Sequence, residues 1–577
     1  MGKRTSAHVV TTTRRYKGRV YHSHLLRRSY REGGTVRKET IANLTPLGDE
    51  IVKLIRCALH GEKVAPVDEI FEVVNSHHHG HVQAVRMAMK QLHFEKLIGS
   101  QHTRERDLVV AMIIARILHP ESKLATTRWW HTTTLAADLD VADATEDNLY
   151  QAMDWLLKRQ DRIEKKLATR HLREGGLVLY DLSSSYFEGV TCPLAARGHN
   201  RDKKKGKLQV NYGLLTDSCG TPVSVSVFPG NTADPTTLMP QVRRVTEGFN
   251  IDSVVLVGDR GMISQTQIDK LKGINGIEWI TALKSPQIAK LVEDGTIRMS
   301  LFDQRNLFEF SHPDFPLERL VVCRNPFMAE HRSRTRISLI RATVKELEKV
   351  KGMVATGRLN AKEKIGLRVG KVVNKYKVAK HFDLDINERH FSYHLLEEKV
   401  TAEAALDGLY VIRTSLSKEQ MSGEDAIRSY KRLSNVERAF RSFKGIDLKV
   451  RPIHHHLENR VRAHIFLCML AYYVQWHMKE VWRELLFSDE DQRAKLARDP
   501  VAPALRSAKA LNKVHRKRLD DDTRVHSFHT LLTDLSTIVR NTCCRKGGGP
   551  GKPRFTMTTT PSAKQKQALE LIDTIVV

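Results

Sequence analysis

Residues 253–261 read S-V-V-L-V-G-D-R-G, a short apolar run that ends on an acid, Asp259. An uninterrupted run of aliphatic residues between polar neighbours is typical of a strand that is covered on both faces of a sheet. Strands of this kind occur in α/β domains, where helices lie on both sides of the sheet. The stretch therefore predicts an α/β core, with Asp259 placed at the end of an interior strand.

A second acid lies inside a predicted strand upstream of this run. Residues 177–186 read L-V-L-Y-D-L-S-S-S-Y, with Asp181 in the middle. Hydrophobic periodicity and turn residues predict the elements that follow each acid. They are strands at 207–215 and 223–228 with a hairpin turn at 217–220, a helix from 234 to about 245, a helix at 264–271 and a strand at 279–283. The resulting order, β-β-β-α-β-α-β, is that of an RNase H-like sheet.

A third candidate acid lies on a predicted helix. Residues 430–444 read Y-K-R-L-S-N-V-E-R-A-F-R-S-F-K and contain no Gly or Pro, which favours one continuous α-helix. Positions seven apart share a face of an α-helix, so Tyr430, Glu437 and Lys444 are expected in one column, with Arg441 leaning the same way. This column suits a site that holds a metal ion and a phosphate together. A solvated helix face with ion pairs between turns explains the same residues equally well.

Three carboxylates, Asp181, Asp259 and Glu437, can thus meet at one edge of the sheet. Hard divalent cations prefer such oxygen ligands, and two ions about 4 Å apart can act on both the attacking and the leaving oxygen of a phosphodiester. Taken singly, either Asp is explained more simply as a turn or capping residue. Their joint placement in this order of strands and helices favours a catalytic site that binds Mg²⁺ or Mn²⁺.

The composition indicates a nucleic-acid partner. The 577-residue chain has 94 Lys and Arg against 66 Asp and Glu, which gives a formal net charge of +28. Its seven cysteines include no C-x-x-C pair, so we expect a reducing compartment and no cysteine-built zinc site. No signal peptide opens the chain, and the longest strongly apolar run, 465–476, is too short to span a bilayer. We therefore expect a soluble, intracellular protein that does not enter a membrane.

Changes in composition and hydrophobic pattern along the chain predict six regions. Residues 1–40 contain eleven Lys and Arg and two Glu, with strand patterns on both sides of a Gly-Gly turn. A basic hairpin of this kind suits a DNA backbone, and a charged edge hairpin is the alternative. The four histidines within 77–81 have no Cys or carboxylate at a ligand spacing, so we do not expect zinc there. The parts are a basic β-hairpin (1–45), a helical DNA-binding region (46–174), the first part of the RNase H-like core (175–289), an inserted α+β subdomain (290–412), the second part of the core with the Glu437 helix (413–490) and a C-terminal region (491–577).

The residues around these acids resemble a known family. The motifs are D-L-S-S-S-Y-F at 181–187, F-P-G-N-T-A-D at 228–234, G-D-R-G at 258–261, the helix at 430–444 and R-P-I-H-H at 451–455. They are similar to the DDE transposases of bacterial insertion sequences, in the group that has a YREK signature and an inserted subdomain before the catalytic Glu. The Tyr, Glu and Lys of the signature fall on Tyr430, Glu437 and Lys444. Leu433 stands at the position of its Arg, so either Arg441 or Arg438 is expected to take that role.

This resemblance implies an enzyme that cuts double-stranded DNA at terminal inverted repeats and joins the ends to target DNA. It also implies a homodimer or larger assembly in the bacterial cytoplasm, associated with the nucleoid. Asp181, Asp259 and Glu437 would be catalytic and metal-binding, and Tyr430 and Lys444 would contact phosphates. The basic run Lys203, Lys204 and Lys205 could follow the DNA backbone, with a solvated loop as the alternative.

Two other functions remain open at this point. One is an RNase H-like DNA endonuclease that hydrolyses DNA without strand transfer. The other is a non-catalytic DNA-binding protein derived from a transposase, which the presence of all three carboxylates disfavours.

Overall fold

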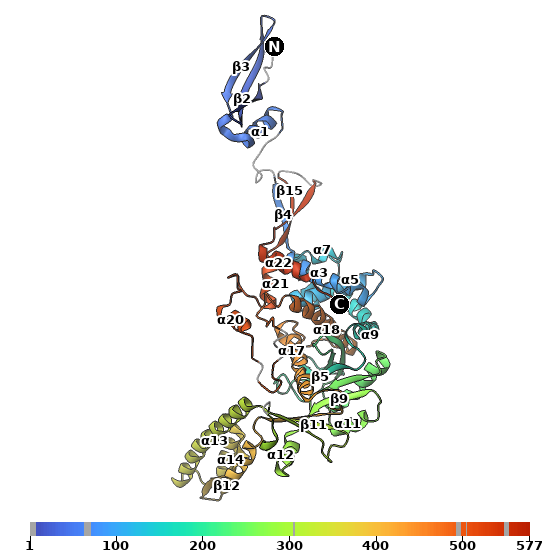
Figure 1. Ribbon diagram of the computed structural model, residues 1–577, viewed down its shortest axis with the longest axis vertical. Helices are drawn as coiled ribbons and strands as arrows, with labels where there is room; N and C mark the ends of the chain where they lie inside the picture. Colours follow the sequence, from blue (N-terminus) through green and yellow to red (C-terminus); the bar gives the residue numbers. More distant parts are fainter. Residues whose placement is uncertain (1–6, 63–70, 304–305, 492–497, 503–504, 547–552) are drawn as a thin grey trace. The chain divides into compact units, whose positions relative to one another are not determined.

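The computed structural model describes all residues except 1–6, 63–70, 304–305, 492–497, 503–504 and 547–552 (Figure 1). The chain divides into two compact units. The smaller unit contains residues 1–77 and 539–559, and the larger unit contains residues 78–538 and 560–577. A large mixed sheet with helices gives the larger unit a mixed α/β fold.

The smaller unit begins with three antiparallel strands, where the sequence predicted a two-stranded hairpin. They are β1 (Ala7–Tyr16), β2 (Arg19–Glu32) and β3 (Thr35–Asn43). The predicted hairpin corresponds to β2 and β3, and β1 was missed. The turn before β2 consists of Lys17 and Gly18, both at positive φ (47° and 75°), as a two-residue hairpin turn requires. Because Lys rarely adopts positive φ, this turn is hard to predict from the sequence.

A buried histidine joins this sheet to the first helix. His24 of β2 is 7% exposed. Its Nδ1 lies 2.9 Å from Thr11 Oγ1, and its Nε2 lies 2.6 Å from Asp49 Oδ1 of α1 (Gly48–Leu59), which follows η1 (Thr45–Leu47). The unit also contains a second small sheet, in the order β16-β15-β4. Its strands are β4 (Phe71–His78), β15 (Val539–Arg545) and β16 (Arg554–Thr558), so the region expected to be helical over 46–174 includes a strand.

The first part of the larger unit is helical, as predicted. Its last two helices are α8 (Glu146–Leu157) and α9 (Gln160–His171). Thr145 begins α8 through a capping box with Asn148. The other helices are α3 (Gly80–Gln91), α4 (Phe94–Ile98), α5 (Arg104–Leu118), α6 (Lys123–Trp129), η2 (Trp130–Thr132) and α7 (Leu135–Asp138).

An eight-stranded sheet follows, in the order β10-β11-β14-β9-β8-β5-β6-β7. β5 is parallel to β8 and β8 is parallel to β9, whereas the other neighbours are antiparallel. The apolar run predicted as an interior strand is β8, and all four of its residues are buried between β5 and β9. The strands are β5 (Gly176–Tyr186), β6 (Gln209–Thr216), β7 (Pro222–Pro229), β8 (Val254–Val257), β9 (Ile277–Ala282), β10 (Leu307–Phe310), β11 (Arg319–Arg324) and β14 (Leu409–Thr414).

The helical connections between these strands follow the predicted order. Between β7 and β8 the chain forms η3 (Asp234–Thr237), α10 (Leu238–Arg243) and η4 (Arg244–Gly248). Between β8 and β9 it forms α11 (Gln265–Leu271), and after β9 it forms α12 (Ser285–Glu293) and η5 (Met299–Leu301).

The stretch that leaves the sheet is shorter than the predicted insertion over 290–412. β10, β11 and β14 extend the main sheet, because they pair with one another and with β9. Between β11 and β14 the chain forms a separate helical bundle with a hydrophobic cluster that includes Leu347, Ile365 and Val369. Its elements are α13 (Pro326–Ala355), α14 (Lys362–Tyr376), η6 (Ala379–His381), β12 (Phe382–Ile386), β13 (Phe391–Leu395) and α15 (Glu397–Ala404). A strand pattern alone does not identify its pairing partner. The sequence analysis therefore placed all the strands over 290–412 in one subdomain.

The predicted helix over 430–444 is three consecutive elements. They are α16 (Gly423–Lys431), α17 (Leu433–Arg441) and the π-helical turn η7 (Ser442–Ile446). The following helix, α18 (Glu458–Val481), is buried along most of its length and packs against β7, α5 and α8. The chain ends with α20 (Ala508–Arg516), α21 (Phe528–Ser536) and α22 (Ala563–Ile572). Within the described ranges, no helix has the length and apolar character needed to cross a membrane.

Candidate active site

Two of the three predicted acids lie near the ends of two neighbouring parallel strand segments, Asp181 within β5 and Asp259 two residues after β8. The β5–β8 pairing continues up to Leu179, which lies opposite Val257. Asp181 comes two residues after Leu179, and Asp259 comes two residues after Val257. Side chains two residues apart project from the same face of a strand. The register therefore brings Asp181 and Asp259 to one place at the edge of the sheet.

The third acid comes from the helix that packs on β5. Glu437 lies on α17, which contacts β5, and its side chain is exposed. The helix axis is interrupted at Arg432, so Tyr430 lies on α16 and Lys444 on η7. Leu433 is 9% exposed and belongs to the main hydrophobic core, which explains why an apolar residue stands at this position of the signature.

Burial and like charge both act on Asp181. Burial is the main cause that raises the pKa of Asp181 to about 7, and the neighbouring charges of Asp259 and Glu437 raise it further. A hydrogen bond from the Leu182 backbone N–H to Asp181 Oδ1 (2.7 Å) and the charge of Arg201 lower the pKa. Asp259 and Glu437 therefore lie close enough to Asp181 for their charges to act on it.

Tyr430 lies beside the same three carboxylates. Burial raises the pKa of Tyr430 to about 12, and Asp259, Glu437 and Asp181 add to this effect while Arg260 opposes it. The phenol is therefore protonated at neutral pH and can donate a hydrogen bond.

The donor chemistry of this site fits a hard divalent cation. Asp259 Oδ1 accepts hydrogen bonds from the backbone N–H groups of Gly261 (2.7 Å) and Met262 (2.9 Å). Asp259 Oδ2, both oxygens of Glu437 and the second oxygen of Asp181 are the remaining acceptors. A dication between them would offset the repulsion that raises the pKa of Asp181. In the part of the chain that the structure describes, no group of three or more His, Cys, Asp or Glu is arranged to hold a metal ion, so ion binding requires these side chains to move together.

Comparisons with known families agree with this arrangement. The family model described as "Transposase DDE domain" matches residues 187–474, and the model described as "IS1634 family transposase, N-terminal domain" matches residues 9–66. The chain belongs to the DDE transposases of insertion sequences. The family predicted from the sequence is thereby confirmed, and the protein is a transposase. The DDE match includes Asp259 and Glu437 and begins after Asp181.

Two solved transposase structures are similar to this transposase at low identity. One is a cryo-EM structure of the piggyBac transposase synaptic complex with hairpin DNA, with 8% identity, a TM-score of 0.34 and coverage of 79% of this chain and 76% of that one. The other is the Mos1 transposase paired-end complex with the left transposon end, with 12% identity, a TM-score of 0.14 and coverage of 33% and 62%. A comparison with curated protein sequences found no match.

Lys444 of the transposase forms an ion pair in this structure. Its Nζ lies 3.1 Å from Asp202 Oδ1, and Asp202, with 1% of its side chain exposed, also pairs with Arg451. Asp202 Oδ2 accepts a hydrogen bond from the Tyr186 backbone N–H (3.0 Å). Burial lowers the pKa of Lys444, and Asp202 opposes this effect. Contact between Lys444 and DNA therefore stays a prediction, and it would require Asp202 to share or release the ammonium group.

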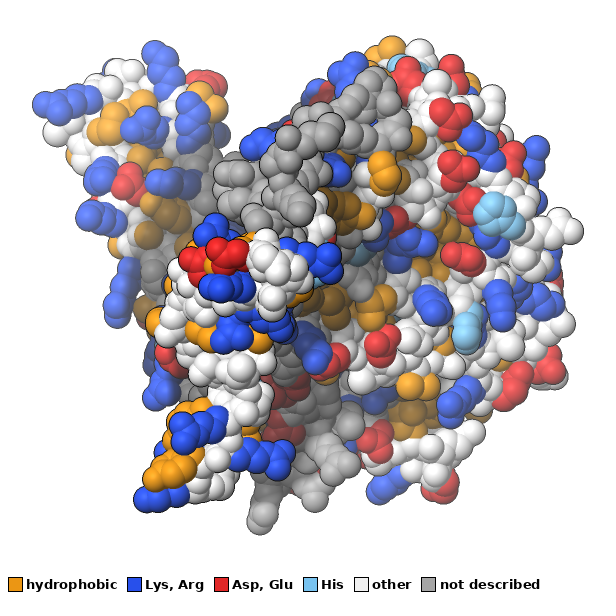
Figure 2. All heavy atoms as spheres, turned by 90° about the horizontal axis from the view of Figure 1, so that it is seen from above, with side chains coloured by type: hydrophobic (Ala, Val, Ile, Leu, Met, Phe, Trp, Pro, Cys, Tyr) orange, Lys and Arg blue, Asp and Glu red, His pale blue; other side chains and the backbone are white. Residues whose placement is uncertain are grey.

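The other predicted DNA-binding residues lie on the surface. Lys203, Lys204 and Lys205 are exposed, and Lys204 Nζ lies 5.9 Å from the centre of the Tyr186 ring. Arg441 is exposed at the end of α17, where no described residue forms a hydrogen bond or ion pair with it. Figure 2 shows Lys and Arg side chains spread over the face in view, with acidic side chains between them.

Sequence reasoning missed Arg201 and Asp202, which directly precede the lysine run. Arg201 lies close enough to Asp181 to lower its pKa, and it pairs with Asp234 at 2.5 Å. Asp202 anchors Lys444 and Arg451. The sequence does contain a sign of this site, an acid placed between basic residues at 201–205. Only the lysines of this run were interpreted as functional.

The raised pKa of Asp181 predicts a stability gain for Asp181→Asn in the metal-free transposase. The carboxyl binds its proton more tightly in the folded than in the unfolded protein, so its ionisation destabilises the fold as the pH rises from about 4 to about 7. Thermal denaturation should therefore show a higher Tm for the variant at pH 8 and a smaller gain at pH 5. The matched variant Asp252→Asn, at an exposed acid, should shift Tm equally little at both pH values. A gain that does not depend on pH would contradict the raised pKa.

Proposed function

We propose that Asp181, Asp259 and Glu437 are the catalytic carboxylates of an RNase H-like core that cuts insertion-sequence ends and transfers their 3′-hydroxyl groups to target DNA. The observation that supports the proposal is the parallel register of β5 and β8, whose last pair, Leu179 and Val257, lies two residues before Asp181 and Asp259 respectively. The strand order β7-β6-β5-β8-β9, with β6 antiparallel to its neighbours, supports the RNase H-like assignment. The helical bundle between β11 and β14 would be the inserted subdomain.

The three carboxylates would hold Mg²⁺ or Mn²⁺. Bound divalent ions supply activation of the attacking oxygen and offset charge on the leaving oxygen. Asp259 suits the central position because backbone N–H groups fix its Oδ1 and leave Oδ2 for an ion. Glu437 approaches from α17, opposite the two strand acids, and Asp181 must lose its proton to act as a ligand.

Residues beside the carboxylates would hold the DNA. Tyr430 can donate its phenolic proton to a phosphate oxygen next to the ions, because its raised pKa keeps it protonated. Arg441 is available as a phosphate-binding cation in place of the Arg that Leu433 replaces. Two copies of the chain, or more, would hold the two ends together on nucleoid DNA.

A strand-transfer assay tests this function. A duplex with a pre-cut transposon end is incubated with supercoiled plasmid and Mg²⁺, and joined products are resolved on a gel. We expect covalent joining of the 3′-hydroxyl strand to the plasmid. Nicked or linear plasmid without joined oligonucleotide would favour an endonuclease, and end binding without either product would favour a non-catalytic DNA-binding protein.

Replacing Lys203, Lys204 and Lys205 together by Gln should weaken the salt dependence of DNA binding. Each phosphate contact contributes about 0.9 to the slope of log K against log salt concentration, because binding releases counterions from the DNA. We expect the slope to fall by about 0.9 for each lysine that contacts a phosphate. The control replaces Lys345, Lys349 and Lys351 on the exposed side of α13, which changes the net charge equally. Identical slopes for the two triple variants would show that the 203–205 loop is only solvated.

A further inference from the structure

A cationic cavity lies between the helical region and the segment that follows η7. Its volume is about 290 Å³. Residues from α5, α6, α8, α18 and the segment 449–455 line it, among them Arg116, Lys123, Arg451, His455 and His464. Glu121 is the acidic residue in this lining, and it pairs with Lys449 at the rim (3.6 Å), where both side chains are about half exposed (44% and 54%).

Lys123 is buried in this cavity without a counter-charge. It is 5% exposed, and no described residue forms a hydrogen bond or an ion pair with its ammonium group. Burial and the charge of Arg116 lower the pKa of Lys123 to about 7. A buried charge without a partner is costly, and proteins normally supply a counter-charge or a ligand.

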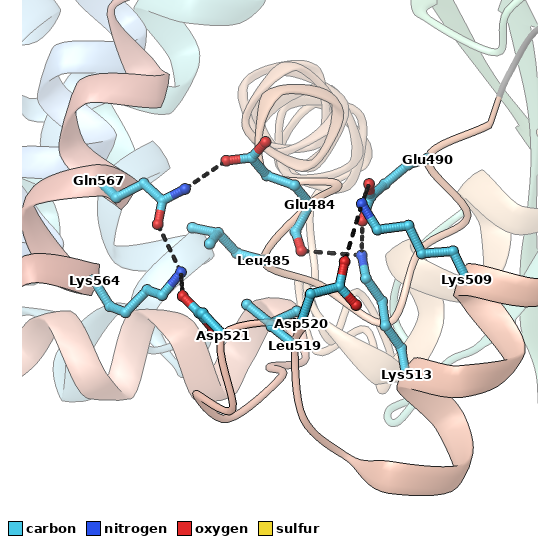
Figure 3. Close-up of a pocket in the computed structure, with 10 residues that line it drawn as sticks. All are labelled: Glu484, Leu485, Glu490, Lys509, Lys513, Leu519, Asp520, Asp521, Lys564 and Gln567. Carbon is cyan, nitrogen blue, oxygen red and sulfur yellow. Dashed lines mark hydrogen bonds and ion pairs between the residues drawn. The ribbon is translucent and has the colours of Figure 1, made fainter.

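Another buried lysine shows the usual solution. Lys513 is 3% exposed, and it pairs with Glu490 and donates to the backbone carbonyls of Arg483, Glu484 and Leu486 at 3.0–3.2 Å. Figure 3 shows the cluster of charged and polar side chains around it, in which lysines lie against acids. Lys513 is therefore satisfied within the fold, whereas Lys123 is not.

Two groups beside Lys123, Arg116 and His464, also lack part of their usual partners. Arg116, 6% exposed, donates only to the carbonyls of Leu448 (3.4 Å) and Glu121 (3.1 Å), so its charge has no carboxylate partner in the described part of the chain. His464 is 5% exposed, and its Nδ1 is buried without a hydrogen bond to any described atom. Two buried cations and an unsatisfied imidazole nitrogen thus border one cavity.

We propose that this cavity binds a phosphate group, and that a phosphate of the DNA backbone is its occupant. A tetrahedral oxyanion can accept hydrogen bonds from Arg116 and Lys123 together and neutralise both charges. Arg451 connects the cavity to Asp202, which directly precedes the exposed lysines at 203–205. The site itself does not depend on the catalytic assignment, whereas its DNA occupant rests on the proposed function.

Inorganic phosphate added to the full-length, DNA-free protein tests the site. At equal ionic strength, 10 mM phosphate should raise the Tm by about 2 °C relative to chloride, because a ligand that binds only the folded state stabilises it. Lys123→Met should abolish this rise and should itself be at least as stable as the wild type in chloride, because it removes a buried, unpaired charge. Lys90→Met, at an exposed lysine of α3, should keep the phosphate-dependent rise. No phosphate-specific rise in the wild type, or an equal rise in Lys123→Met, would overturn the proposal.

DNA binding distinguishes the two sources of phosphate. If the occupant is a backbone phosphate, Lys123→Met should lower the salt slope of DNA binding by about 0.9 relative to Lys90→Met, and inorganic phosphate should compete with DNA. If the Tm effect is lost but both variants bind DNA alike, the cavity is a phosphate site that takes free phosphate, and the DNA occupant is wrong. Failure of the catalytic proposal, such as normal cutting by Glu437→Gln, would leave these results unchanged.

Discussion

Glu437→Gln is expected to reduce strand cleavage by at least about a thousandfold while affinity for transposon-end DNA stays within about twofold. The amide keeps the size of the side chain and removes the charge that would hold a divalent ion. Charge stabilisation by such ions accounts for several kcal/mol of the barrier, and each 1.4 kcal/mol corresponds to about tenfold in rate. Glu437 is exposed on α17, so the substitution should not disturb the core. Cleavage is measured on labelled end duplexes with Mg²⁺, and binding by gel shift in its absence.

Glu424→Gln provides the matched control. Glu424 lies on α16 and pairs with Arg428 at 3.3 Å. Its replacement should leave cleavage within about threefold, since partly exposed ion pairs contribute little. Full cutting by Glu437→Gln would show that Glu437 is not a catalytic residue. Loss of both end binding and cutting would equally contradict the prediction.

Asp259→Cys should be inactive with Mg²⁺ and regain measurable cleavage with Mn²⁺. The substitution exchanges a hard oxygen ligand for sulfur, which Mg²⁺ binds poorly and Mn²⁺ tolerates better. Asp259 is the most informative position because it lies two residues after β8, as Asp181 lies two residues after Leu179, the partner of Val257 in the register. The measurement is the ratio of cleavage rates in Mn²⁺ and Mg²⁺ for each variant.

Three companion variants separate ligand loss from structural damage. Asp259→Asn keeps an oxygen that can accept the N–H groups of Gly261 and Met262, so it should fold normally and stay inactive with both metals. Asp259→Ala should also be inactive with both. Asp252→Cys, at an exposed position before β8, should not change the metal preference. Normal cutting by Asp259→Cys in Mg²⁺ would show that Asp259 is not a ligand. If Mn²⁺ alone fails to restore cleavage by Asp259→Cys, the evidence against Asp259 as a ligand is weaker, because the C–S bond is longer and displaces an ion.

Local patterns identified the core strands and the acids on them. The apolar run of β8 could be read directly, because a strand covered on both faces needs aliphatic residues at every position. The alternation of strands and helices then predicted that Asp181 and Asp259 can meet at one edge of the sheet, and the structure shows that β5 and β8 are neighbouring parallel strands. The motifs around these acids were also enough to identify the transposase family, which the family models confirm.

Contacts between distant segments could not be read in this way. The limits of the inserted stretch depend on β11 and β14 pairing with each other and with β9, and a strand pattern does not name its partner. Lys444 carries the positive charge expected of a phosphate-binding residue. In the fold, however, this charge is paired with Asp202, which lies 242 positions away in the sequence. The single helix expected over 430–444 is likewise divided, at Arg432 and again where η7 begins at Ser442.

The sequence by itself thus determined the α/β class, the basic character, the family and the strands that carry two of the acids, because composition and periodicity are properties of neighbouring residues. Only the tertiary structure decided which charges are paired. Lys123 is the first residue of α6 and Lys513 lies in the last turn of α20, and both lysines are buried. Lys513 meets Glu490 and three carbonyl groups, whereas Lys123 meets Arg116 across an empty volume. Burial without a counter-charge is a property of packing, and packing is fixed by residues far apart in the chain.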